Sequence, residues 1–420
     1  MRILRRSFLS GMAAFAGGGA ATILSRRAYG KVGFGSLVAD PEHVLDLPAG
    51  FSYVRLQVAG APMSDGNPAG LLPDAMACFE ADDKNYILMR NHEEDSGTNP
   101  LPDVAFAPDA MGGVSRLVIA RDSLRVSSSN LILTGTRRNC AGGPSPLGWF
   151  SCEESEAEGH GWTFLCDPYA DRVQPPRRIA SFGRFKHEAV AFDPRTSIAY
   201  LTEDLMDGSL YRHVPDDDKD PFAGKLQGLA IVSTDRFPTG TALQVGDLRQ
   251  VRWVDVGDAA ATSTPTRTQA QDRGAAIVVR GEGIWFDRGA VFFTATAGGP
   301  TNQGQVFRLD LDEDGDLLTL VAQEEGEGEL TAPDNITVAP WGDLLVCEDH
   351  DGTPNHVRGI TPDGQVYPFV RNAHEGGRSE FAGVCFSPDG KVMFVNLQES
   401  GWTFAITGPF PKGRGCVGCG

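Results

Sequence analysis

The chain has 420 residues, of which 37 are Lys or Arg and 55 are Asp or Glu, so its formal net charge is −18. Phosphate backbones repel such an acidic chain, so we expect no nucleic acid partner, and the charge fits either cation binding or plain solubility. With 51 Gly, 27 Pro and only 22% charged residues, we expect frequent turns, few long helices, and one large β-domain or two ordinary ones.

The first thirty residues have the layout of an export signal. The pair Arg5 and Arg6 in LRRSFLS precedes a mildly apolar, Ala- and Gly-rich run from Phe8 to Leu24, and a candidate cleavage site follows Gly30. We therefore predict that residues 1–30 are a twin-arginine signal peptide for the twin-arginine (Tat) export machinery, and that the folded mature protein is periplasmic or secreted. The run is weakly hydrophobic and no second one follows, so we expect no stable membrane span in the mature form. An uncleaved anchor is the alternative.

One pattern recurs six times downstream: an apolar strand, a turn, and a second apolar strand, with acidic residues at the strand ends. In chain order the copies are MACFEADDKNYILMRNHEE (76–94), CAGGPSPLGWFSCEE (140–154), HEAVAFDPRTSIAYLTED (187–204), GEGIWFDRGAVFFTATAGG (281–299), ELTAPDNITVAPWGDLLVCEDHDG (329–352) and FAGVCFSPDGKVMFVNLQ (381–398). Aligned by their turns, they start at residues 76, 140, 187, 281, 334 and 381. Spacings of roughly 50 residues, with two longer intervals, fit four-stranded propeller blades with insertions.

These repeats predict an all-β protein, a six-bladed β-propeller over residues 31–410 with a flexible tail over 411–420. A β-sandwich also fits the local strand signals, but a sandwich gives no reason for acids at equivalent places in separate hairpins. The region 215–268 holds the acidic run DDDKD and the Ser/Thr-rich ATSTPTRTQAQ. We expect it to be an outer-strand insertion and surface loop within the same domain.

Carboxylates recur at two equivalent places in the pattern. Just before the first strand stand Glu188, Glu282 and Asp334, and at the far end of the second strand stand Glu153, Glu203 and Glu348. In a propeller the innermost strands run along the central axis, so these ends would meet at one channel mouth. Gathering such carboxylates costs several kcal/mol or forces protonation unless cations neutralise them. Calcium accepts about six to eight oxygen ligands. The alternative is that the acids only cap strands and form turns.

Four further residues of the repeats have side chains suited to chemistry. Cys140, in RRNCAGG, is either a buried small residue or a thiolate ligand to a softer metal such as iron. Arg280 directly precedes a repeat and either binds a phosphate or carboxylate through two points or pairs with a neighbouring acid. His92 and His187 each precede a candidate ligand, and we expect them to support the neighbouring acid by a hydrogen bond.

Two tempting motifs are set aside. DLDEDGD (310–316) resembles the first half of a calcium-binding helix–loop–helix, but Val321 stands at its twelfth position and strand-like segments flank it, so we predict a hairpin turn. Cys416 and Cys419 form a CxxC in a glycine-rich tail with no second pair. We interpret this tail as disordered or closed by a local disulfide.

The combined motifs resemble the PhoX-type alkaline phosphatase family. The similarity runs in order from about residue 40 to 408 and rests on the twin-arginine start and on NHEE, NCAGG…SCEE, FKHEAVAFDP…YLTED, RGEG…FFTATAGG, PDNI…LLVCED and EFAGVCFSPDGKVMFVN. The resemblance implies a six-bladed propeller with a cluster of Fe³⁺ and Ca²⁺ in its central channel. It further implies the hydrolysis of phosphomonoesters outside the cytoplasm.

The same resemblance implies roles for individual residues. Cys140 and Glu153 would be ligands on the iron side, Glu188 and Glu282 bridging carboxylates, and Asp334, Glu348 and Asp349 mainly calcium ligands. Arg280 would hold the substrate phosphate, and Glu93 and Glu203 would be weaker ligands or contacts of the ligands. Two other classes remain open: a calcium-dependent propeller lactonase or esterase, and a non-catalytic metal-binding propeller of the cell envelope.

Overall fold

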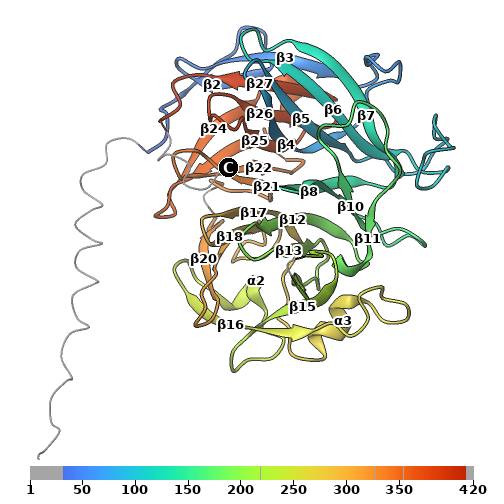
Figure 1. The fold of residues 1–420 in the computed structure, drawn as a ribbon. Coiled ribbons are helices and arrows are strands. Elements are labelled where there is room, and N and C mark those ends of the chain that lie inside the picture. The colour runs from blue at the N-terminus through green and yellow to red at the C-terminus, as the bar shows by residue number, and fades with distance from the viewer. Residues whose placement is uncertain (1–31, 218, 327, 353, 413–420) are drawn as a thin grey trace, which may run out of the picture.

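Short antiparallel strands form nearly all of the regular structure in the computed structural model, which describes residues 32–217, 219–326, 328–352 and 354–412. The predicted export signal and the CxxC of Cys416 and Cys419 lie outside these residues. The strands are arranged around a central axis, and the first and last parts of the described chain lie beside each other (Figure 1). The prediction of an all-β, propeller-like fold is thus confirmed.

The six predicted repeats are six hairpins. They are β4 (Pro73–Asp82) with β5 (Asn85–His92), β8 (Asn139–Ser145) with β9 (Gly148–Glu153), β12 (His187–Asp193) with β13 (Ile198–Glu203), β17 (Gly281–Asp287) with β18 (Ala290–Ala295), β21 (Pro333–Val338) with β22 (Leu344–Glu348), and β25 (Phe381–Phe386) with β26 (Met393–Leu397). Their first strands contact one another in cyclic order, and β25 closes the ring on β4. These six inner strands therefore surround the axis.

The outer strands complete the sheets around this ring. They are β6 (Gly112–Ala120), β7 (Val126–Thr136), β10 (Thr163–Cys166), β11 (Arg178–Ile179), β14 (Leu210–Pro215), β15 (Gly224–Ile231), β16 (Leu248–Asp255), β19 (Gln305–Asp310), β20 (Leu317–Gln323), β23 (His356–Ile360), β24 (Val366–Asn372) and β27 (Trp402–Thr407). The strands β19 and β20 pair antiparallel, so DLDEDGD is a hairpin turn, as predicted. Helices are few and short: η1 (Ala180–Phe182), α2 (Thr239–Ala242), α3 (Thr266–Gln271) and η2 (His374–Gly377).

The prediction of six separate blades needs a correction, because hydrogen bonding gathers the strands into five sheets. Strand β16 pairs with β15 on one edge and with β20 on the other, so the runs β12–β15 and β17–β20 share one nine-stranded sheet. An outer strand presents unpaired backbone N–H and C=O groups along its edge. The region 215–268, expected as an insertion, supplies a strand that satisfies two such edges at once.

Strands from the N-terminal part close the ring. β3 (Ser52–Val58) pairs with β27, and β2 (Leu45–Pro48), itself paired with β1 (Leu37–Val38), pairs with β24. An aromatic cluster covers this junction, where the Phe34 ring packs within 5.4 Å of the rings of Phe51, Trp341 and Phe369. The ring is therefore closed by strands far apart in sequence. No helix among the described residues has the length and apolar character to cross a membrane.

Candidate metal-binding site at the channel mouth

All six inner hairpins share one irregularity at their first residues. The ladder shifts so that two residues of the inner strand face one of its partner, for example between His187 and Val190 and between Gly281 and Ile284. The same shift occurs in the hairpins that begin with β4, β8 and β21, and one residue later in the hairpin that begins with β25. A bulge of this kind re-aims a side chain out of the regular ladder. The second residue of each inner strand is thereby presented at one level: Asp74, Cys140, Glu188, Glu282, Asp334 and Ala382.

Two groups of possible metal ligands form at this level. The ligand atoms of Cys140, Glu154 and Glu188 lie within 4.8 Å of one another, and so do those of Glu188, Glu282 and Asp334. Cys140, Glu154, Glu188 and Glu282 are buried, and Asp334 is half-buried. Because Glu188 belongs to both groups, they form one continuous cluster. The structure therefore brings together the predicted residues Cys140, Glu188, Glu282 and Asp334.

Asp74 belongs beside this cluster, although the sequence reasoning missed it. Its pKa is raised well above the usual range by burial and then by the charges of Glu93 and Asp334. Gln398 donates to Asp74 Oδ2 and to Glu93 Oε2, both at 3.0 Å, while Asp74 Oδ1 is buried with no hydrogen-bond partner among the described residues. The repeat alignment started at Met76, two residues too late to include this aspartate.

The predicted ligand Glu153 lies outside the cluster. Its Oε1 accepts hydrogen bonds from the Arg137 N–H at 2.9 Å and from His160 Nδ1 at 2.7 Å, and its Oε2 accepts from the Gly161 N–H at 2.9 Å. These bonds tie down the chain after β9. The next residue, Glu154, is the one that joins the cluster, because successive residues at a strand end point to opposite sides.

Glu203 and Glu348 have the same structural place as Glu153. Glu203 accepts from the Ser209 N–H at 3.1 Å and the Tyr211 hydroxyl at 2.7 Å. Glu348 accepts from His356 and, at 2.9 Å, from Arg358 Nε. Both carboxylates therefore hold loops, and neither lies in the ligand cluster.

The second acid of the pair that ends β22 does lie beside the cluster. Burial and then the neighbouring charge of Asp349 raise the pKa of Asp334 well above its usual range. Glu380, which the sequence reasoning also missed, is buried, and burial followed by a hydrogen bond with Asp349 raises its pKa. Asp349 therefore interacts with both Asp334 and Glu380 and disfavours the ionised form of each.

Basic residues directly precede three neighbouring inner strands: Arg138, Lys186 and Arg280. Each joins two acids, so that charges alternate along one side of the mouth. The order of this arc is Glu93, Arg138, Glu154, Lys186, Asp204, Arg280 and Glu282, with contacts of 2.6 to 2.8 Å at every step. The sequence analysis gave pairing with a neighbouring acid as one alternative for Arg280, but it missed Arg138, Lys186 and Asp204.

Arg280 is held in a specific conformation at the mouth. Its Nε donates to Asp204 Oδ1 and its Nη2 to Glu282 Oε1, both at 2.8 Å, while 36% of its side chain stays exposed. Its φ of 52° lies in the left-handed region, which is costly for a residue with a Cβ. Arg138 has the same feature with φ 49°. Leu72 and Ala332, which directly precede β4 and β21, have the same left-handed φ, so this kinked backbone belongs to the hairpin repeat and does not depend on a basic side chain.

The prediction for the two histidines is wrong. His92 bonds Leu71 O at 3.1 Å and Ser115 Oγ at 2.8 Å, and His187 bonds Gly183 O at 3.0 Å. Neither bonds to the acid that follows it. Burial lowers the pKa of both rings, so they act as neutral supports of nearby backbone.

The donor set fits iron and calcium. Burial, followed by the charges of the neighbouring acids, raises the pKa of Cys140 and Glu188 well above their usual values. Cations would relieve this cost, since buried carboxylates without counter-charges must take up protons. A thiolate among carboxylates suits iron, and the all-oxygen group suits calcium. The unpartnered Asp74 Oδ1 is a further donor with no other use.

The channel is nearly closed beneath the cluster. A cavity of only about 20 Å³ remains there. It is lined mainly by the third and fourth residues of the inner strands, among them Ala75, Ala141, Ala189, Gly283, Asn335 and Gly383. Small side chains at the axis let the six strands approach one another. A substrate-sized ligand therefore has no room below the cluster.

Comparison with known proteins gives one family. The family model described as alkaline phosphatase PhoX matches residues 32–130 and 118–401. No curated protein matches the chain. A solved structure, Pseudomonas fluorescens PhoX in complex with vanadate, a transition state analogue, is 19% identical and covers 90% of this chain and 98% of its own, with a TM-score of 0.68. At 19% identity, this likeness shows a shared fold.

A second solved structure, the gluconolactonase XC5397 from Xanthomonas campestris, is 13% identical. It covers 90% of this chain and 99% of its own, with a TM-score of 0.46. That likeness is too low to bear on the function.

Proposed function

Since the chain belongs to the PhoX alkaline phosphatase family and is therefore a phosphoester hydrolase, we propose that it acts outside the cytoplasm as a metal-dependent phosphomonoesterase that releases inorganic phosphate. The observation that carries this proposal is the buried cluster around Glu188, where a cysteine and carboxylates meet at the channel mouth. Its fold would be a six-bladed propeller in which two blades share strand β16. The extracytoplasmic location rests on the Arg5–Arg6 stretch.

We further propose that the cofactors are Fe³⁺ and Ca²⁺. The iron ligands would be Cys140, Glu154 and Glu188. The calcium ligands would be Glu188, Glu282 and Asp334, with Asp74 and Asp349 beside them. When bound, these cations would supply Lewis-acid neutralisation of the phosphoryl oxygens and activate the attacking oxygen. This assignment moves the iron-side carboxylate from Glu153 to Glu154 and leaves Glu348 as a loop support.

The protein's own groups would position the phosphate. Arg280 is fixed by Asp204 and Glu282 but remains 36% exposed at the mouth, so its planar guanidinium can bind two phosphate oxygens. Arg138 and Lys186 add positive charge along the same arc, which favours a dianionic phosphate in a protein of net charge −18. The ion pairs of the arc keep these three side chains in place, so little reorganisation is needed when the ester binds.

The alternative of a calcium-dependent lactonase would give no function to two features of the site. A lactone carries no phosphate for the basic arc of Arg138, Lys186 and Arg280 to bind. Calcium also prefers oxygen ligands, so Cys140 within the cluster would be an unfavourable ligand. The phosphomonoesterase accounts for both.

The proposal is tested by removing the cysteine from the cluster. We expect Cys140→Ala to lose iron, its visible thiolate-to-iron absorption and most of its release of phosphate from p-nitrophenyl phosphate. Cys166→Ala is the matched control, because both thiols are 3% exposed but Cys166 lies on β10 away from the cluster. Equal iron content and equal activity in the two variants would overturn the assignment.

A further inference from the structure

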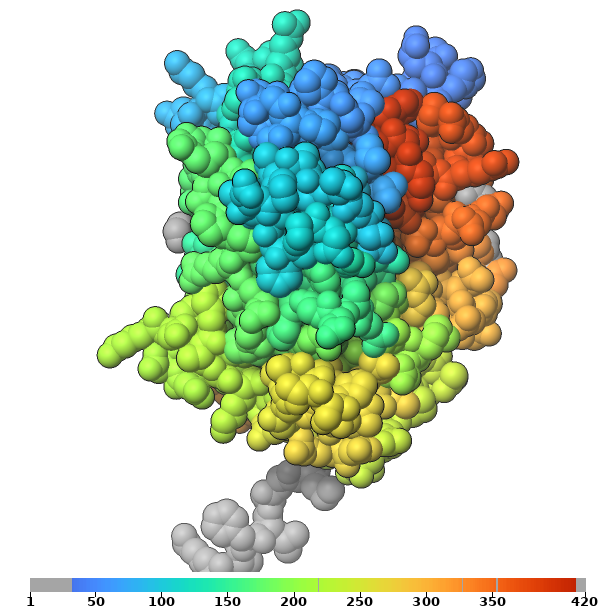
Figure 2. Space-filling model, turned by 90° about the vertical axis from the view of Figure 1, so that its right-hand side faces the viewer, coloured from blue at the N-terminus to red at the C-terminus, as the bar shows by residue number. Residues whose placement is uncertain are grey.

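An apolar groove lies next to the channel mouth and outside the ligand cluster. It consists of a cavity of about 250 Å³ and a second of about 400 Å³, which share Leu71, Glu94 and Met111. Its walls come mainly from two parts of the chain, residues 59–72, which lead into β4, and residues 92–134, which run from β5 to β7. Residues 399–401 also line it. Figure 2 shows these two parts of the chain, in blue and cyan, side by side on one face of the molecule.

The groove begins at the groups that surround the cluster. Leu72 stands two residues before Asp74, Glu94 follows Glu93, and Glu399 follows Gln398. The backbone joins the two regions, since the Glu93 N–H donates to Leu72 O at 3.0 Å and the Arg138 N–H donates to Glu94 O at 2.8 Å. The groove residues are therefore one or two positions along the chain from the residues beside the cluster. A molecule whose phosphate binds at the mouth has this groove next to it.

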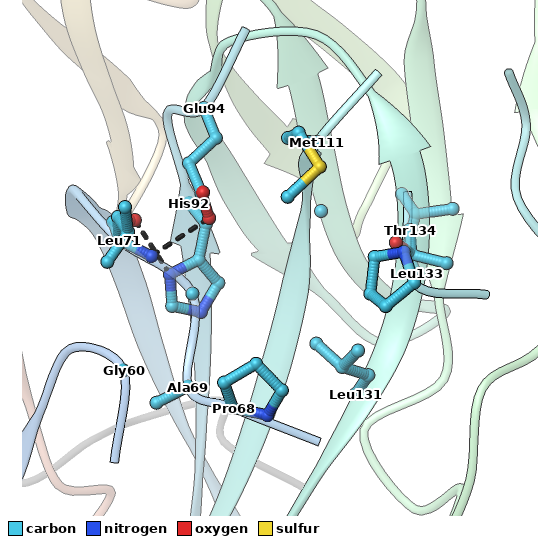
Figure 3. Close-up of a pocket in the computed structure, with 13 residues that line it drawn as sticks. Gly60, Pro68, Ala69, Leu71, His92, Glu94, Met111, Leu131, Leu133 and Thr134 are labelled. Carbon is cyan, nitrogen blue, oxygen red and sulfur yellow. Dashed lines mark hydrogen bonds between the residues drawn. The ribbon is translucent and has the colours of Figure 1, made fainter. Parts of the chain in front are cut away.

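The groove walls offer apolar surface and few hydrogen-bonding groups. Figure 3 shows Met111, Leu131 and Leu133 along one side, with Leu71 and His92 on the other. Both ring nitrogens of His92 are already bonded, to Leu71 O and Ser115 Oγ. Leu71 is 53% exposed, so its side chain is accessible to a ligand in the groove.

The charged groups of the groove are all acidic. Glu94, Asp95 and Glu399 line the part nearest the mouth, and the Glu94 carboxylate accepts from the Leu71 N–H at 2.8 Å. An anionic group placed here would be repelled, whereas an uncharged one would not. The basic arc lies on the neighbouring side of the mouth, so the phosphate and the rest of an ester meet opposite charge environments.

We propose that this groove binds the alcohol part of the phosphomonoester and selects uncharged apolar groups over anionic ones. This inference rests on the proposed function, because it takes the phosphate of the ester to lie at the cluster. Each methylene that enters the groove leaves water, which at full burial amounts to roughly a fourfold gain in binding. Since only about 20 Å³ of space remains below the cluster, the alcohol part has no room there and extends outward.

The test is the hydrolysis of n-alkyl phosphates from methyl to hexyl by the metal-loaded enzyme. The leaving alcohols differ little in basicity, so the chemical step stays nearly constant along the series. We expect kcat/KM to rise roughly two- to fourfold per added methylene until the groove is filled. A flat series with good hydrolysis of methyl phosphate would overturn the groove and leave the phosphatase standing. No release of phosphate from any ester would overturn the proposed function itself.

Variants locate the effect in the groove. Met111→Trp fills it, so the dependence on chain length should flatten while methyl phosphate is hydrolysed within about twofold of the parent rate. Leu71→Asp, at an exposed position, should flatten the series as well and serves if the first variant misfolds. Leu147→Trp is the matched control, because Leu147 is 43% exposed in the β8–β9 turn, at the opposite end of β8 from Cys140. Full retention of the chain-length dependence in both groove variants would overturn the proposal.

A charge variant tests the selection against anions. Glu94→Gln keeps an oxygen that accepts from the Leu71 N–H but removes the negative charge. We expect it to raise kcat/KM for a carboxyalkyl phosphate about threefold or more and to leave hexyl phosphate within about twofold. An equal change for both substrates would contradict the proposed selection by charge.

Discussion

The two sides of the channel mouth use the same hairpin repeat but balance its acids differently. On the side of β8, β12 and β17, Arg138, Lys186 and Arg280 alternate with acids. On the side of β21, β25 and β4, the equivalent places hold Ala332, Glu380 and Leu72. Among the described residues, no ion pair with Lys or Arg joins Asp74, Asp334, Asp349 or Glu380.

The pKa values follow this difference. Burial raises the pKa of Asp204, but bonds from Arg280 and Lys186 outweigh it and bring the value well below the usual range. Burial raises the pKa of Asp74, Asp334 and Glu380, and their acidic neighbours raise it further. The protein's own cations therefore balance Asp204, whereas burial still raises the pKa of Glu154 and Glu282 in the arc. Those two acids and the acidic side depend on cations or protons from outside.

Removing the cations should give the largest effect and tests whether the acidic side of the mouth depends on them. If calcium balances the acidic side, chelation should lower the free energy of unfolding by about 4 kcal/mol for a site held at a thousand times its Kd. Thermal unfolding before chelation, after it, and after calcium is restored would measure the effect. An unchanged melting curve in protein that elemental analysis shows to be metal-free would mean that the acids need no cation.

The basic side is probed by Arg280→Lys. Lysine keeps the charge beside Asp204 and Glu282 but loses the planar two-point contact with phosphate. We expect kcat/KM to fall roughly thirty- to a thousandfold, about 2–4 kcal/mol, with metal content and melting temperature nearly unchanged. Inorganic phosphate should also inhibit the variant less.

The matched control for this variant is Arg195→Lys. Arg195 pairs with Asp193 at the end of β12 far from the mouth, so its substitution should leave kcat/KM unaltered. Loss of metal or stability in Arg280→Lys, with normal turnover per intact cluster, would make Arg280 a purely structural partner of the acids.

Glu348 and Glu203, the acids that hold loops outside the ligand cluster, differ in pKa in the same way as Asp204 and the acidic side of the mouth. Burial raises the pKa of Glu348, but bonds from His350, His356 and Arg358 outweigh it and bring the value to about 2. For Glu203 burial dominates and raises the pKa to about 7. We therefore expect Glu348→Gln to cost about 2–3 kcal/mol of unfolding free energy at pH 7, and Glu203→Gln less than about 1 kcal/mol. Urea unfolding would measure both, and equal costs would contradict the pKa contrast.

The same shifts predict opposite dependences on pH. The folded-state pKa of Glu348 is depressed, so its contribution is present above the ordinary glutamate pKa and is lost as the pH falls toward about 2. The folded-state pKa of Glu203 is raised, so its carboxyl stabilises the fold below the ordinary value and loses that contribution as the pH rises through about 7. Unfolding as a function of pH should show each dependence disappear in the corresponding Gln variant.

The smallest effect expected on the cation site itself concerns Asp74. Replacement by Asn removes one charge beside the calcium group while keeping an oxygen for the bond from Gln398. We expect about a tenfold weaker calcium affinity, near 1.4 kcal/mol, in calorimetric titration. Asp193→Asn, at the far end of β12, is the control. An unchanged affinity would place Asp74 outside the cation site.

Much of the fold could be predicted because its repeats are local. Strands β12, β17 and β25 begin at the predicted residues 187, 281 and 381, since alternating apolar residues and turn residues mark a hairpin within about twenty positions. The predicted residues Cys140, Glu188, Glu282 and Asp334 come together because they occupy the same place in their repeats. A periodic pattern is enough to place residues at one level of a ring.

What the sequence by itself determined is therefore the hairpin repeat and the ends of its strands, because side-chain alternation and turn residues act over a few neighbours. Only the tertiary structure decided that Glu154 and not Glu153 faces the cluster, because Glu153 is bonded to groups on the other side of the chain while Glu154 lies beside Cys140 and Glu188. It also decided that β16 joins two runs of strands and that residues 59–72 form a groove with Met111. Those contacts depend on hydrogen bonds and packing between segments far apart in the chain, which no local pattern records.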